Sequence, residues 1–435
     1  MSGKNIILGG GVTGLAAGVV SGWPIYEAEA SPGGICSSYY MRPGDPQRYN
    51  EPPADGEAYR FEIGGGHWIW GREQDTLEFI RSFARLKNYE RLSAVYFPDR
   101  DLYVPYPIQN HLSSLPPDVA GKALDDILQG GYQPVSTLAD WLRANFGTTL
   151  YDLFFGPFHE LYCAGLHDQI APQDMYKSPV DKNLIIKGAQ EKTPVVGYNA
   201  SFLYPEKGLN DLVFRMAAKC HINYGKKVVK INVIEKEVQF DDGTKIGYDK
   251  IISTLPLNQM MEITGLDPLV PADPYTSVLV VNIGAMCGPR CPKEHWLYIP
   301  RSRSGFHRVG FYSNVDASFL PISCRDKHNR VSIYVERSFR GGEKPEAGGV
   351  KAYEAAVVKE LQSWGFIEET EVMDSTWIPI AYTWSRPNSS WREESFELNA
   401  SHSIYQAGRF ARWTNQGITE SIRQGLETVS LLLRS

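Results

Sequence analysis

The sequence predicts an α/β fold built on a parallel sheet, and three observations in the first 27 residues support this prediction. Residues 4–8 form a short apolar run typical of a buried strand, a glycine-rich turn follows, and a helical pattern begins at residues 15–17. Residues 23–27 then have the pattern of a second strand that ends in an acidic residue. A strand, a turn, a helix and a strand in this order open a parallel α/β sheet.

Length and composition limit the other possibilities. A chain of 435 residues allows two or three domains, and 43% hydrophobic with 22% charged residues is ordinary for a soluble folded protein, which excludes disorder, collagen and a coiled coil. The net charge of −6, without a dense basic run, predicts neither a nucleic-acid nor a membrane partner. Glycines interrupt the apolar start of the chain, so we expect no signal peptide and a cytoplasmic protein. Six scattered cysteines predict free thiols and no metal site.

Later segments are predicted from periodicity and from turn residues. Proline and glycine make residues 41–60 a loop, and residues 136–146, with Ser136 or Thr137 as the cap, open a mainly helical region that runs to about residue 190. Residues 227–233 and 250–254 are predicted strands, and a turn signal at 241–243 lies between them. The remaining predicted elements are strands at 277–284, 307–313, 331–336 and 403–405 and a closing helix at 420–433.

The glycines of the first turn have the spacing Gly9-x-Gly11-x-x-Gly14, between a predicted strand and a predicted helix. The first glycine permits a tight turn, the second lets the backbone approach a pyrophosphate, and the third lets the helix pack on the strand. Glu27 ends the next strand, where its carboxylate can accept hydrogen bonds from ribose hydroxyls, with Glu29 as the alternative. The pattern predicts a dinucleotide site, while a glycine turn without a ligand remains the structural alternative.

Two further glycine clusters follow. Gly33 and Gly34 come shortly after the acidic residue and suit another close approach of the backbone to a ligand. Gly65 and Gly66 precede His67 in an aromatic-rich segment. A histidine in such a segment is by itself more often a core residue, so its interpretation depends on the rest of the chain.

The pattern G-G-G-x-T-G-L, followed by I-Y-E-A and P-G-G, is similar to the FAD-binding opening of the amine oxidase and protoporphyrinogen oxidase superfamily. Further stretches resemble the UDP-galactopyranose mutases, especially the eukaryotic type, in the same order over nearly the whole chain. These stretches are Gly65-Gly66-His67, residues 104–110, Asn199 to Phe202 with Tyr204-Pro205, Thr254-Leu255-Pro256, Trp296-Leu297-Tyr298, Phe306-His307-Arg308 with Ser313-Asn314, and Gly408-Arg409-Phe410 with Trp413.

The resemblance implies a Rossmann-like FAD-binding domain that is discontinuous in sequence, with a helical insertion and an antiparallel-sheet domain on the substrate side. The expected FAD-binding segments are residues 1–100, 205–262 and 395–435. The expected helical domain is 101–204, the expected antiparallel domain is 263–394, and a loop near 195–206 is expected to close over substrate.

The resemblance also implies an activity. Mutases of this family interconvert the pyranose and furanose rings of a nucleotide-diphosphate sugar: N5 of the reduced flavin attacks the anomeric carbon and expels the nucleoside diphosphate, after which the sugar ring opens and recloses. The implied cofactor is therefore FAD in its reduced form, with NADPH or NADH as the expected reductant. UDP-galactose is the default substrate, and a GDP- or dTDP-linked sugar is the rival.

Site residues are carried over by motif. Arg308 matches the arginine that grips the diphosphate, although a salt bridge at a strand end is its structural alternative, and Tyr298 and Tyr382 match hydroxyl donors to the same phosphates. His67 and Arg409 match residues beside the flavin, and these two together with Arg308 are the expected catalytic residues. The expected base-binding residues are Tyr106, Gln109, Phe158 and Asn199, and the expected FAD-binding residues are Gly9, Gly11, Gly14, Glu27, Gly33, Gly34, Gly65, Gly66, His67, Gly408 and Arg409.

The chain departs from the family in three places. Lys177 stands where the family has a second diphosphate-binding arginine, and Asn415 matches a substrate-binding asparagine whose preceding tyrosine is missing here. Ile35-Cys36-Ser37-Ser38 lacks the usual basic residue. Two alternatives therefore stay open: an oxidase of amine or porphyrin-like substrates, and a non-catalytic escort of lipidated GTPases with the same fold. The sequence also leaves open whether the chain forms a homo-oligomer.

Overall fold

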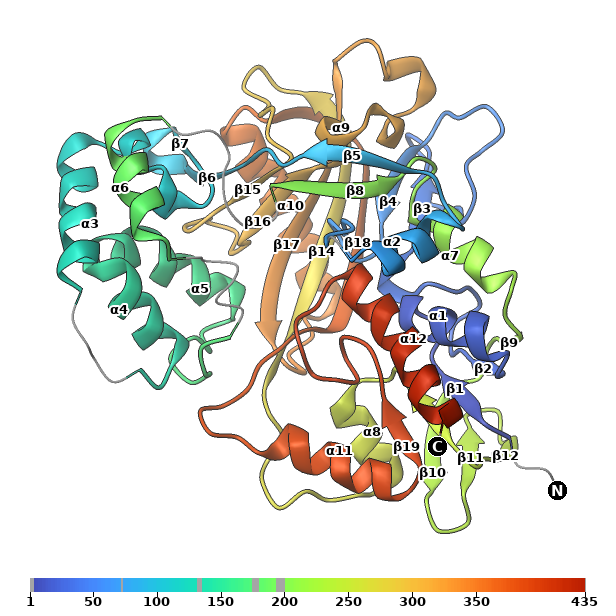
Figure 1. Ribbon diagram of the computed structural model, residues 1–435. Helices are drawn as coiled ribbons and strands as arrows, with labels where there is room; N and C mark the ends of the chain where they lie inside the picture. The colour runs from blue at the N-terminus through green and yellow to red at the C-terminus, as the bar shows by residue number, and fades with distance from the viewer. Residues whose placement is uncertain (1–3, 72, 131–134, 174–179, 193–199, 435) are drawn as a thin grey trace.

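The computed structural model describes residues 4–71, 73–130, 135–173, 180–192 and 200–434. Its fold class is the one that the sequence predicts. Figure 1 shows a parallel-sheet domain on one side, a long antiparallel sheet in the middle, and a group of helices on the other side.

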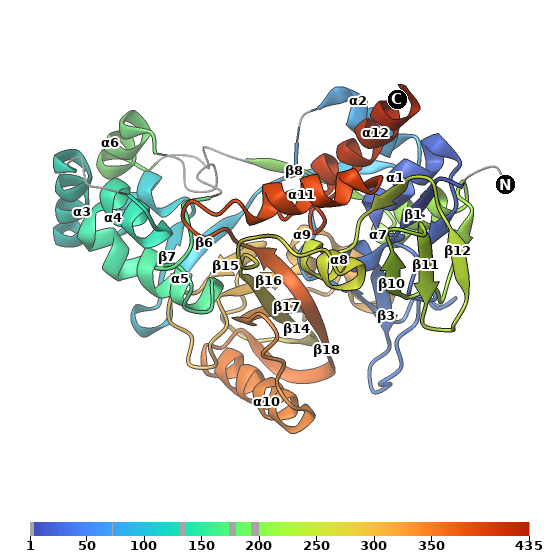
Figure 2. The same cartoon turned by 90° about the horizontal axis from the view of Figure 1, so that it is seen from below.

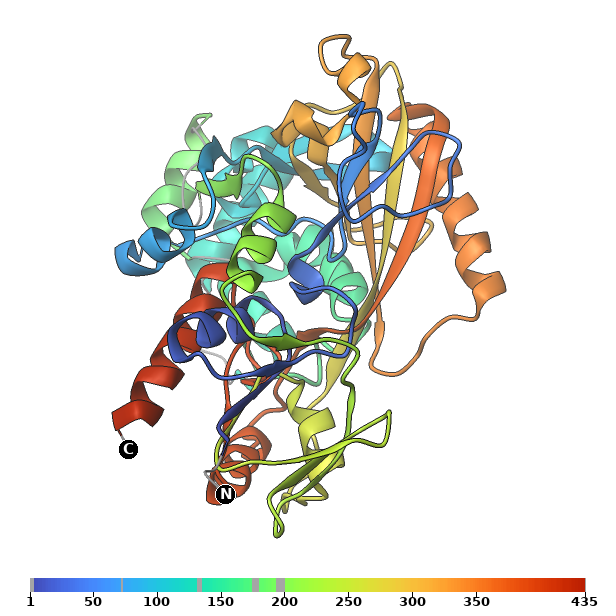
Figure 3. The ribbon, with the colours of Figure 1, turned by 90° about the vertical axis from the view of Figure 1, so that its right-hand side faces the viewer.

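The parallel sheet has the strand order β19-β13-β1-β2-β9, with every neighbouring pair parallel. Its strands are short and apolar, and Ile6, Ile7 and Leu8 are fully buried, as expected for a sheet covered on both faces. The strands are β1 (Ile6–Leu8), β2 (Ile25–Tyr26), β9 (Ile222–Asn223), β13 (Ile251–Ser253) and β19 (Ile404–Gln406). They come from segments far apart in the sequence, and the last helix ends on the same side of the molecule as the start of β1 (Figure 3).

The layers around this sheet are held by close helix packing. Gly14, Gly18 and Gly425 leave room where α1 meets β1, β2 and α12, because a Cβ on any of them would lie within 2.6 Å of a neighbouring atom. The helices nearby are α1 (Val12–Ser21), α2 (Gln74–Arg81), α7 (Leu209–Ala217), α8 (Leu257–Thr264), α11 (Trp391–Ser401) and α12 (Ile418–Arg434). A small antiparallel sheet of β10 (Val228–Asn232), β11 (Glu237–Phe240) and β12 (Lys245–Gly247) shares a buried apolar cluster with β1 and β13, and the turn expected at 241–243 joins β11 to β12.

The central sheet has the order β18-β14-β17-β16-β15-β6-β7, and all its pairs are antiparallel except β15 with β6. Helix α10 (Ala347–Ser363) covers its outer face (Figure 2). The strands are β6 (Ser93–Phe97), β7 (Leu102–Pro105), β14 (Tyr275–Cys287), β15 (Trp296–Tyr298), β16 (Arg308–Phe311), β17 (Arg330–Arg340) and β18 (Ile367–Thr383); the short helix α9 (Tyr312–Val315) follows β16.

Two expectations about segments need correction. The expected boundary at residue 100 falls between β6 and β7, which pair with each other, so residues 93–97 belong with the antiparallel sheet and not with the segment expected to bind FAD. Within the expected closing loop at 195–206, residues 201–205 form a strand, β8 (Ser201–Pro205), which pairs with β5 (Leu86–Glu90); residues 195–199 lie outside the described residues.

The helical region packs against β6 and β7 through one large apolar cluster. It consists of α3 (Pro117–Gln129), α4 (Leu138–Leu150), the π-helical segment η5 (Tyr151–Phe155), α5 (Gly156–Tyr162) and α6 (Lys182–Gln190). Thr137 caps α4, as one of the two expected candidates: its Oγ1 accepts from the backbone N–H of Asp140, and the Asp140 carboxylate accepts from the N–H of Thr137.

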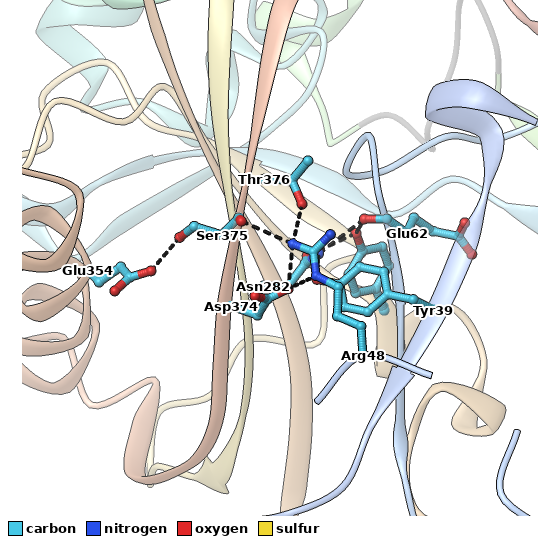
Figure 4. A network of polar contacts seen from close by, with 9 residues as sticks. Tyr39, Arg48, Glu62, Asn282, Glu354, Asp374, Ser375 and Thr376 are labelled. Atoms are coloured by element: carbon cyan, nitrogen blue, oxygen red, sulfur yellow. Dashed lines mark hydrogen bonds and ion pairs between the residues drawn. The ribbon is translucent and has the colours of Figure 1, made fainter. Parts of the chain in front are cut away.

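Polar contacts join the parallel-sheet domain to the antiparallel sheet. Strands β3 (Ser38–Met41) and β4 (Tyr59–Glu62) form a small sheet beside β14 and β18 (Figure 4). Asn282 of β14 donates to Tyr39 Oη and to the carbonyl of Glu62, at 2.9 and 3.1 Å. Arg48 lies over the Tyr39 ring and donates to Asp374 of β18 at 2.7 Å. These contacts fix the small sheet of β3 and β4 against β14 and β18 of the central sheet.

Within the described part of the chain, no helix is long and apolar enough to cross a bilayer.

Candidate active site

One cavity of about 510 Å³ lies where the parallel-sheet domain, the antiparallel sheet and the helical region meet. This volume is typical of a small-molecule or cofactor site. Of the residues predicted to bind ligands, those that line it are Gly9, Gly11, Glu27, Gly33, Gly34, Gly66, His67, Tyr106, Phe158, Tyr298, Arg308, Tyr382, Gly408, Arg409 and Asn415.

The glycine turn after β1 forms one end of the cavity. Gly9 has φ +97°, which favours glycine, and a Cβ on Gly14 would lie 2.0 Å from the carbonyl oxygen of Gly9, so this position packs the helix on the turn. A Cβ on Gly11, by contrast, would meet no atom within 4 Å. Gly11 therefore opens onto the cavity at the N-terminus of α1, whose first turn carries neither a side-chain cap nor an acidic residue.

Glu27 is held at the edge of the same turn. Its carboxylate accepts hydrogen bonds from the backbone N–H groups of Gly10 and Glu29, at 2.5 and 2.8 Å. The side chain is 9% exposed and lines the cavity. Gly33 and Gly34, both with positive φ, bring a second backbone segment to this end, where Gly33 donates to the carbonyl of Gly10 at 2.8 Å.

The loop after β4 carries His67 into the cavity wall. Burial and the nearby Arg409 guanidinium lower the pKa of His67 to about 4, so the imidazole is neutral at pH 7. Its Nδ1 lies 3.4 Å from the carbonyl oxygen of Gly65, which favours the tautomer with the proton on Nδ1. A Cβ on Gly66 would lie 2.2 Å from Tyr334 Oη, so this loop rests directly on β17.

Arg308, at the start of β16, lines the same cavity as the glycine turn and forms a two-pronged ion pair with Glu336 of β17. Nε donates to one carboxylate oxygen at 2.9 Å and Nη2 donates to both, at 2.6 and 2.5 Å. Burial alone would raise the pKa of Glu336, but Arg308 and His307 hold it at about 2. Arg308 therefore lines the cavity and also makes the salt bridge that the sequence offered as its structural alternative.

Arg409 faces the cavity from the turn after β19. Its two terminal nitrogens each donate to a backbone carbonyl, Nη1 to Gln416 and Nη2 to Ala381, both at 3.0 Å. The guanidinium carbon lies 5.5 Å from the centre of the Tyr382 ring. Because these acceptors are uncharged, Arg409 brings a positive charge to the cavity.

An aromatic wall closes the side formed by the helical region. Tyr106 and Tyr298 have ring centres 4.5 Å apart, and Phe158 stacks on Tyr162 at 5.5 Å. Tyr162 in turn contacts the Tyr382 ring edge-on at 4.7 Å. Burial raises the pKa of Tyr382 to about 12, so its hydroxyl keeps its proton and can donate at neutral pH.

Three of the predicted site residues that the structure describes do not line the cavity, and two more cannot be placed. Gly14 lies behind the glycine turn, and Gly65 lies behind His67, where a Cβ would be 2.6 Å from Glu336 Oε1. Gln109 is fully buried. To contact a nucleotide base it would require the side chains that cover it to move. Lys177 and Asn199 lie outside the described residues.

Sequence reasoning missed several residues of the wall, above all Glu336 and also His307, Arg91, His159 and Tyr162. Glu336 is the last residue of the predicted strand 331–336. A charged residue at the end of an apolar strand was the signal that could have marked it as a site residue. Nothing in the sequence indicates that β16 and β17 pair with Arg308 opposite Glu336.

The glycine end of the cavity fits a dinucleotide such as FAD. The open side of Gly11, the uncapped start of α1 and the cavity-facing Glu27 are the features that a pyrophosphate and a ribose require. Among the described residues, no group of three or more histidine, cysteine, aspartate or glutamate side chains could hold a metal ion.

Comparisons with known proteins agree with this fit. Residues 25–429 match the family model for flavin containing amine oxidoreductases. A solved structure of reduced UDP-galactopyranose mutase is similar over 100% of this chain and 96% of that chain, with a TM-score of 0.83 and 22% identity. A protein from Exiguobacterium sp. 255-15 assigned as a protoporphyrinogen oxidase covers 100% of both chains with a TM-score of 0.74 and 16% identity. Putrescine oxidase bound to putrescine covers 100% of this chain and 99% of its own, with a TM-score of 0.58 and 15% identity.

Proposed function

The chain belongs to the family of flavin-containing amine oxidoreductases, whose cofactor is FAD, and from that premise we propose that it is a nucleotide-sugar pyranose–furanose mutase. The observation that carries the proposal is that Arg308, Tyr298 and Tyr382 line the same cavity as the glycine turn and the His67 loop. The fold similarity to a UDP-galactopyranose mutase adds support. A cation with phenolic hydroxyls in the same cavity as a dinucleotide cradle suits a second, phosphorylated ligand.

For the cofactor, Gly11, the start of α1 and Glu27 would hold the pyrophosphate and ribose, and the His67 loop and Arg409 would border the flavin ring. When bound and reduced, the flavin supplies the nucleophile for the anomeric carbon of the sugar. His67 would take part as a neutral hydrogen-bonding group, because its pKa is lowered to about 4. Arg409 would face the flavin with a charge that no carboxylate hydrogen-bonded to it compensates, since the acceptors of its hydrogen bonds are backbone carbonyls.

For the substrate, Arg308 and the hydroxyls of Tyr298 and Tyr382 would hold the nucleoside diphosphate. A leaving group that must return to the same carbon has to stay bound while the sugar ring opens and recloses, since its escape would end in hydrolysis. A guanidinium fork and phenolic hydroxyls provide directional donors for this purpose. The aromatic wall with Tyr106 and Phe158 would stack on the base and exclude water.

A second candidate is an oxidase of an amine or a porphyrin-like substrate. The family model describes amine oxidoreductases, and oxidases share this fold. The aromatic side of the cavity would accept an apolar substrate. This alternative predicts that substrate reduces the flavin and that oxygen then yields peroxide, whereas a mutase leaves the flavin oxidation state unchanged over a turnover.

The test is to reduce the purified flavoprotein anaerobically with dithionite, NADPH or NADH and to incubate it with UDP-galactofuranose and with GDP- and dTDP-linked furanoses. We expect a pyranose product from one of them. We also expect Arg308→Ala to lower kcat/KM roughly 100-fold while the flavin spectrum is unchanged. Arg330→Ala is the matched control, because Arg330 pairs with Glu371 outside the cavity.

The outcomes separate the alternatives. No pyranose product from any nucleotide furanose, with flavin bound and reduced, would refute the mutase. Peroxide formation with an amine or a porphyrinogen would establish the oxidase instead. Purified protein that neither contains flavin nor binds added FAD would favour the non-catalytic escort.

A further inference from the structure

Glu336 has no role in the function proposed above, yet it is the direct partner of the cavity's diphosphate-binding candidate. Its side chain is 2% exposed, whereas that of Arg308 is 22% exposed. The carboxylate is therefore the more deeply buried partner of the pair, and the guanidinium is the more exposed one. Both residues line the cavity, but Arg308 is the more exposed of the two, so an anion that enters the cavity contacts the guanidinium more readily than the carboxylate.

The ion pair with Glu336 occupies one edge of the Arg308 guanidinium and leaves a second edge available for a ligand. Nε and Nη2 point to the carboxylate, with three contacts between 2.5 and 2.9 Å. In the described part of the chain, Nη1 makes no such contact. A guanidinium offers donors on two edges suited to a two-pronged acceptor, so the edge formed by Nη1 and the second proton of Nη2 is the one left for a ligand.

Other neighbours hold Glu336 in place. His307 Nε2 lies 3.5 Å from Oε2, and the ring is 1% exposed. Oε1 would lie 2.6 Å from a Cβ on Gly65, so the carboxylate also touches the loop that carries His67. Glu336 thus contacts both Arg308 and the loop that carries His67, so that a movement of one would displace the other.

We propose, on the basis of the function above, that Glu336 is a positioning residue that sets both the direction and the strength with which Arg308 holds a diphosphate. It presents the Nη1–Nη2 edge to the cavity in one orientation. It also compensates the charge of the arginine, so that the anion is held by directional hydrogen bonds more than by net charge. Such a grip retains the leaving group during the reaction and releases the product afterwards.

The proposal predicts opposite effects on affinity and on turnover. In Glu336→Gln the shape of the side chain is kept and a hydrogen-bond acceptor remains, but the negative charge beside Arg308 is lost. A diphosphate should then bind about tenfold more tightly at low ionic strength, because the arginine charge is no longer compensated. Turnover should fall by roughly the same factor, because the product, which carries the diphosphate, is released slowly and Arg308 is less firmly oriented.

The experiment measures binding without relying on turnover. Inorganic diphosphate and UDP are titrated into the oxidised flavoprotein, with flavin fluorescence or calorimetry as the readout, for the wild type, Glu336→Gln, Glu336→Asp and Arg308→Ala. Glu371→Gln is the matched control: Glu371 pairs with Arg330 at 2.7 Å in the same sheet but does not line the cavity, and the change in net charge is identical. Steady-state kcat and KM are measured in parallel on whichever nucleotide sugar is active.

We expect tighter diphosphate binding in Glu336→Gln, no change in Glu371→Gln, and loss of binding in Arg308→Ala. Equal affinities of the wild type and Glu336→Gln would overturn the proposal, as would wild-type diphosphate binding that does not depend on Arg308, or no binding at all. If binding responds as expected but no nucleotide sugar is isomerised, the proposed function fails and the positioning role stands. If the mutase is active and diphosphate affinity does not change in Glu336→Gln, the proposed function stands and the positioning role fails.

Discussion

At the scale of single residues, Gly11 and Gly14 belong to the same glycine motif but have different roles. Gly14 packs against the carbonyl oxygen of Gly9, and a methyl group there has no room. Gly11, two positions after Gly9, has an ordinary φ of −70° and empty space in front of its Cα. One glycine is therefore needed by the fold and the other by the ligand.

Alanine at these two positions should separate stability from cofactor binding. Gly14→Ala should lower the free energy of unfolding by about 2 kcal/mol, because α1 must move off the turn. Gly11→Ala should cost less than about 1 kcal/mol in the apoprotein but weaken FAD binding about tenfold, because the methyl group occupies the path of the pyrophosphate. Thermal unfolding of the apoproteins and fluorescence titration with FAD would measure the two effects. Equal FAD affinity of Gly11→Ala and the wild type would mean that the pyrophosphate does not approach this turn.

At the scale of elements, the pair β3 and β4 contains a buried carboxylate that titrates near neutrality. Ser38 of β3 lies opposite Glu62 of β4, and its hydroxyl donates to both carboxylate oxygens at 3.0 Å. Tyr204 also donates to Glu62. Burial raises the pKa of Glu62 from 4.5 to about 7, although Arg60, Tyr204 and Ser38 act in the opposite direction.

This pKa predicts a loss of stability as the pH rises. Between pH 4.5 and about 7 the folded state binds the Glu62 proton more tightly than the unfolded state, so the free energy of unfolding falls across this window. The contribution is at most about 3 kcal/mol. Glu62→Gln should remove it and leave the protein more stable than the wild type at pH 8. Denaturant unfolding at pH 5 and pH 8 would measure this, with Glu397→Gln on the exposed side of α11 as the control. An unchanged pH dependence in Glu62→Gln would contradict the assignment.

Elements whose signal is local could be predicted from the sequence, and others could not. The cap at Thr137 and the turn at 241–243 depend on neighbours in the chain, and both lie where they were expected. Strand β18 was missed, although it has 17 residues. Its segment from Glu368 to Glu371 is rich in exposed or half-buried charge, and it becomes a strand because it pairs along β14 at the edge of the sheet. Pairing of this kind depends on a distant partner that local periodicity does not reveal.

At the scale of the whole molecule, the candidate site forms from segments that only the tertiary fold brings together. The family resemblance identified Arg308 and His67 as site residues, and both line the cavity. The sequence did not predict how the segments that carry Arg308 and His67 contact each other. Both contact β17, where Glu336 pairs with Arg308 and Tyr334 lies against Gly66. Strand register decides which residues of β16 and β17 face each other, and a one-residue shift would turn Glu336 away from Arg308.

The contact between the His67 loop and the antiparallel sheet should therefore control the cofactor site from outside it. A Cβ on Gly66 would lie 2.2 Å from Tyr334 Oη and 2.6 Å from the adjoining ring carbon, so Gly66→Ala must lift the loop off β17. We expect a changed flavin absorption spectrum and a lower thermal midpoint. Tyr334→Phe removes the closest atom, so the double variant Gly66→Ala with Tyr334→Phe should recover part of both, with a coupling free energy of about 1 kcal/mol. Tyr334→Phe alone completes the cycle. Strictly additive effects would mean that the loop does not rest on this ring, and that the two halves of the cavity are held together by other contacts, such as the network around Asn282 (Figure 4).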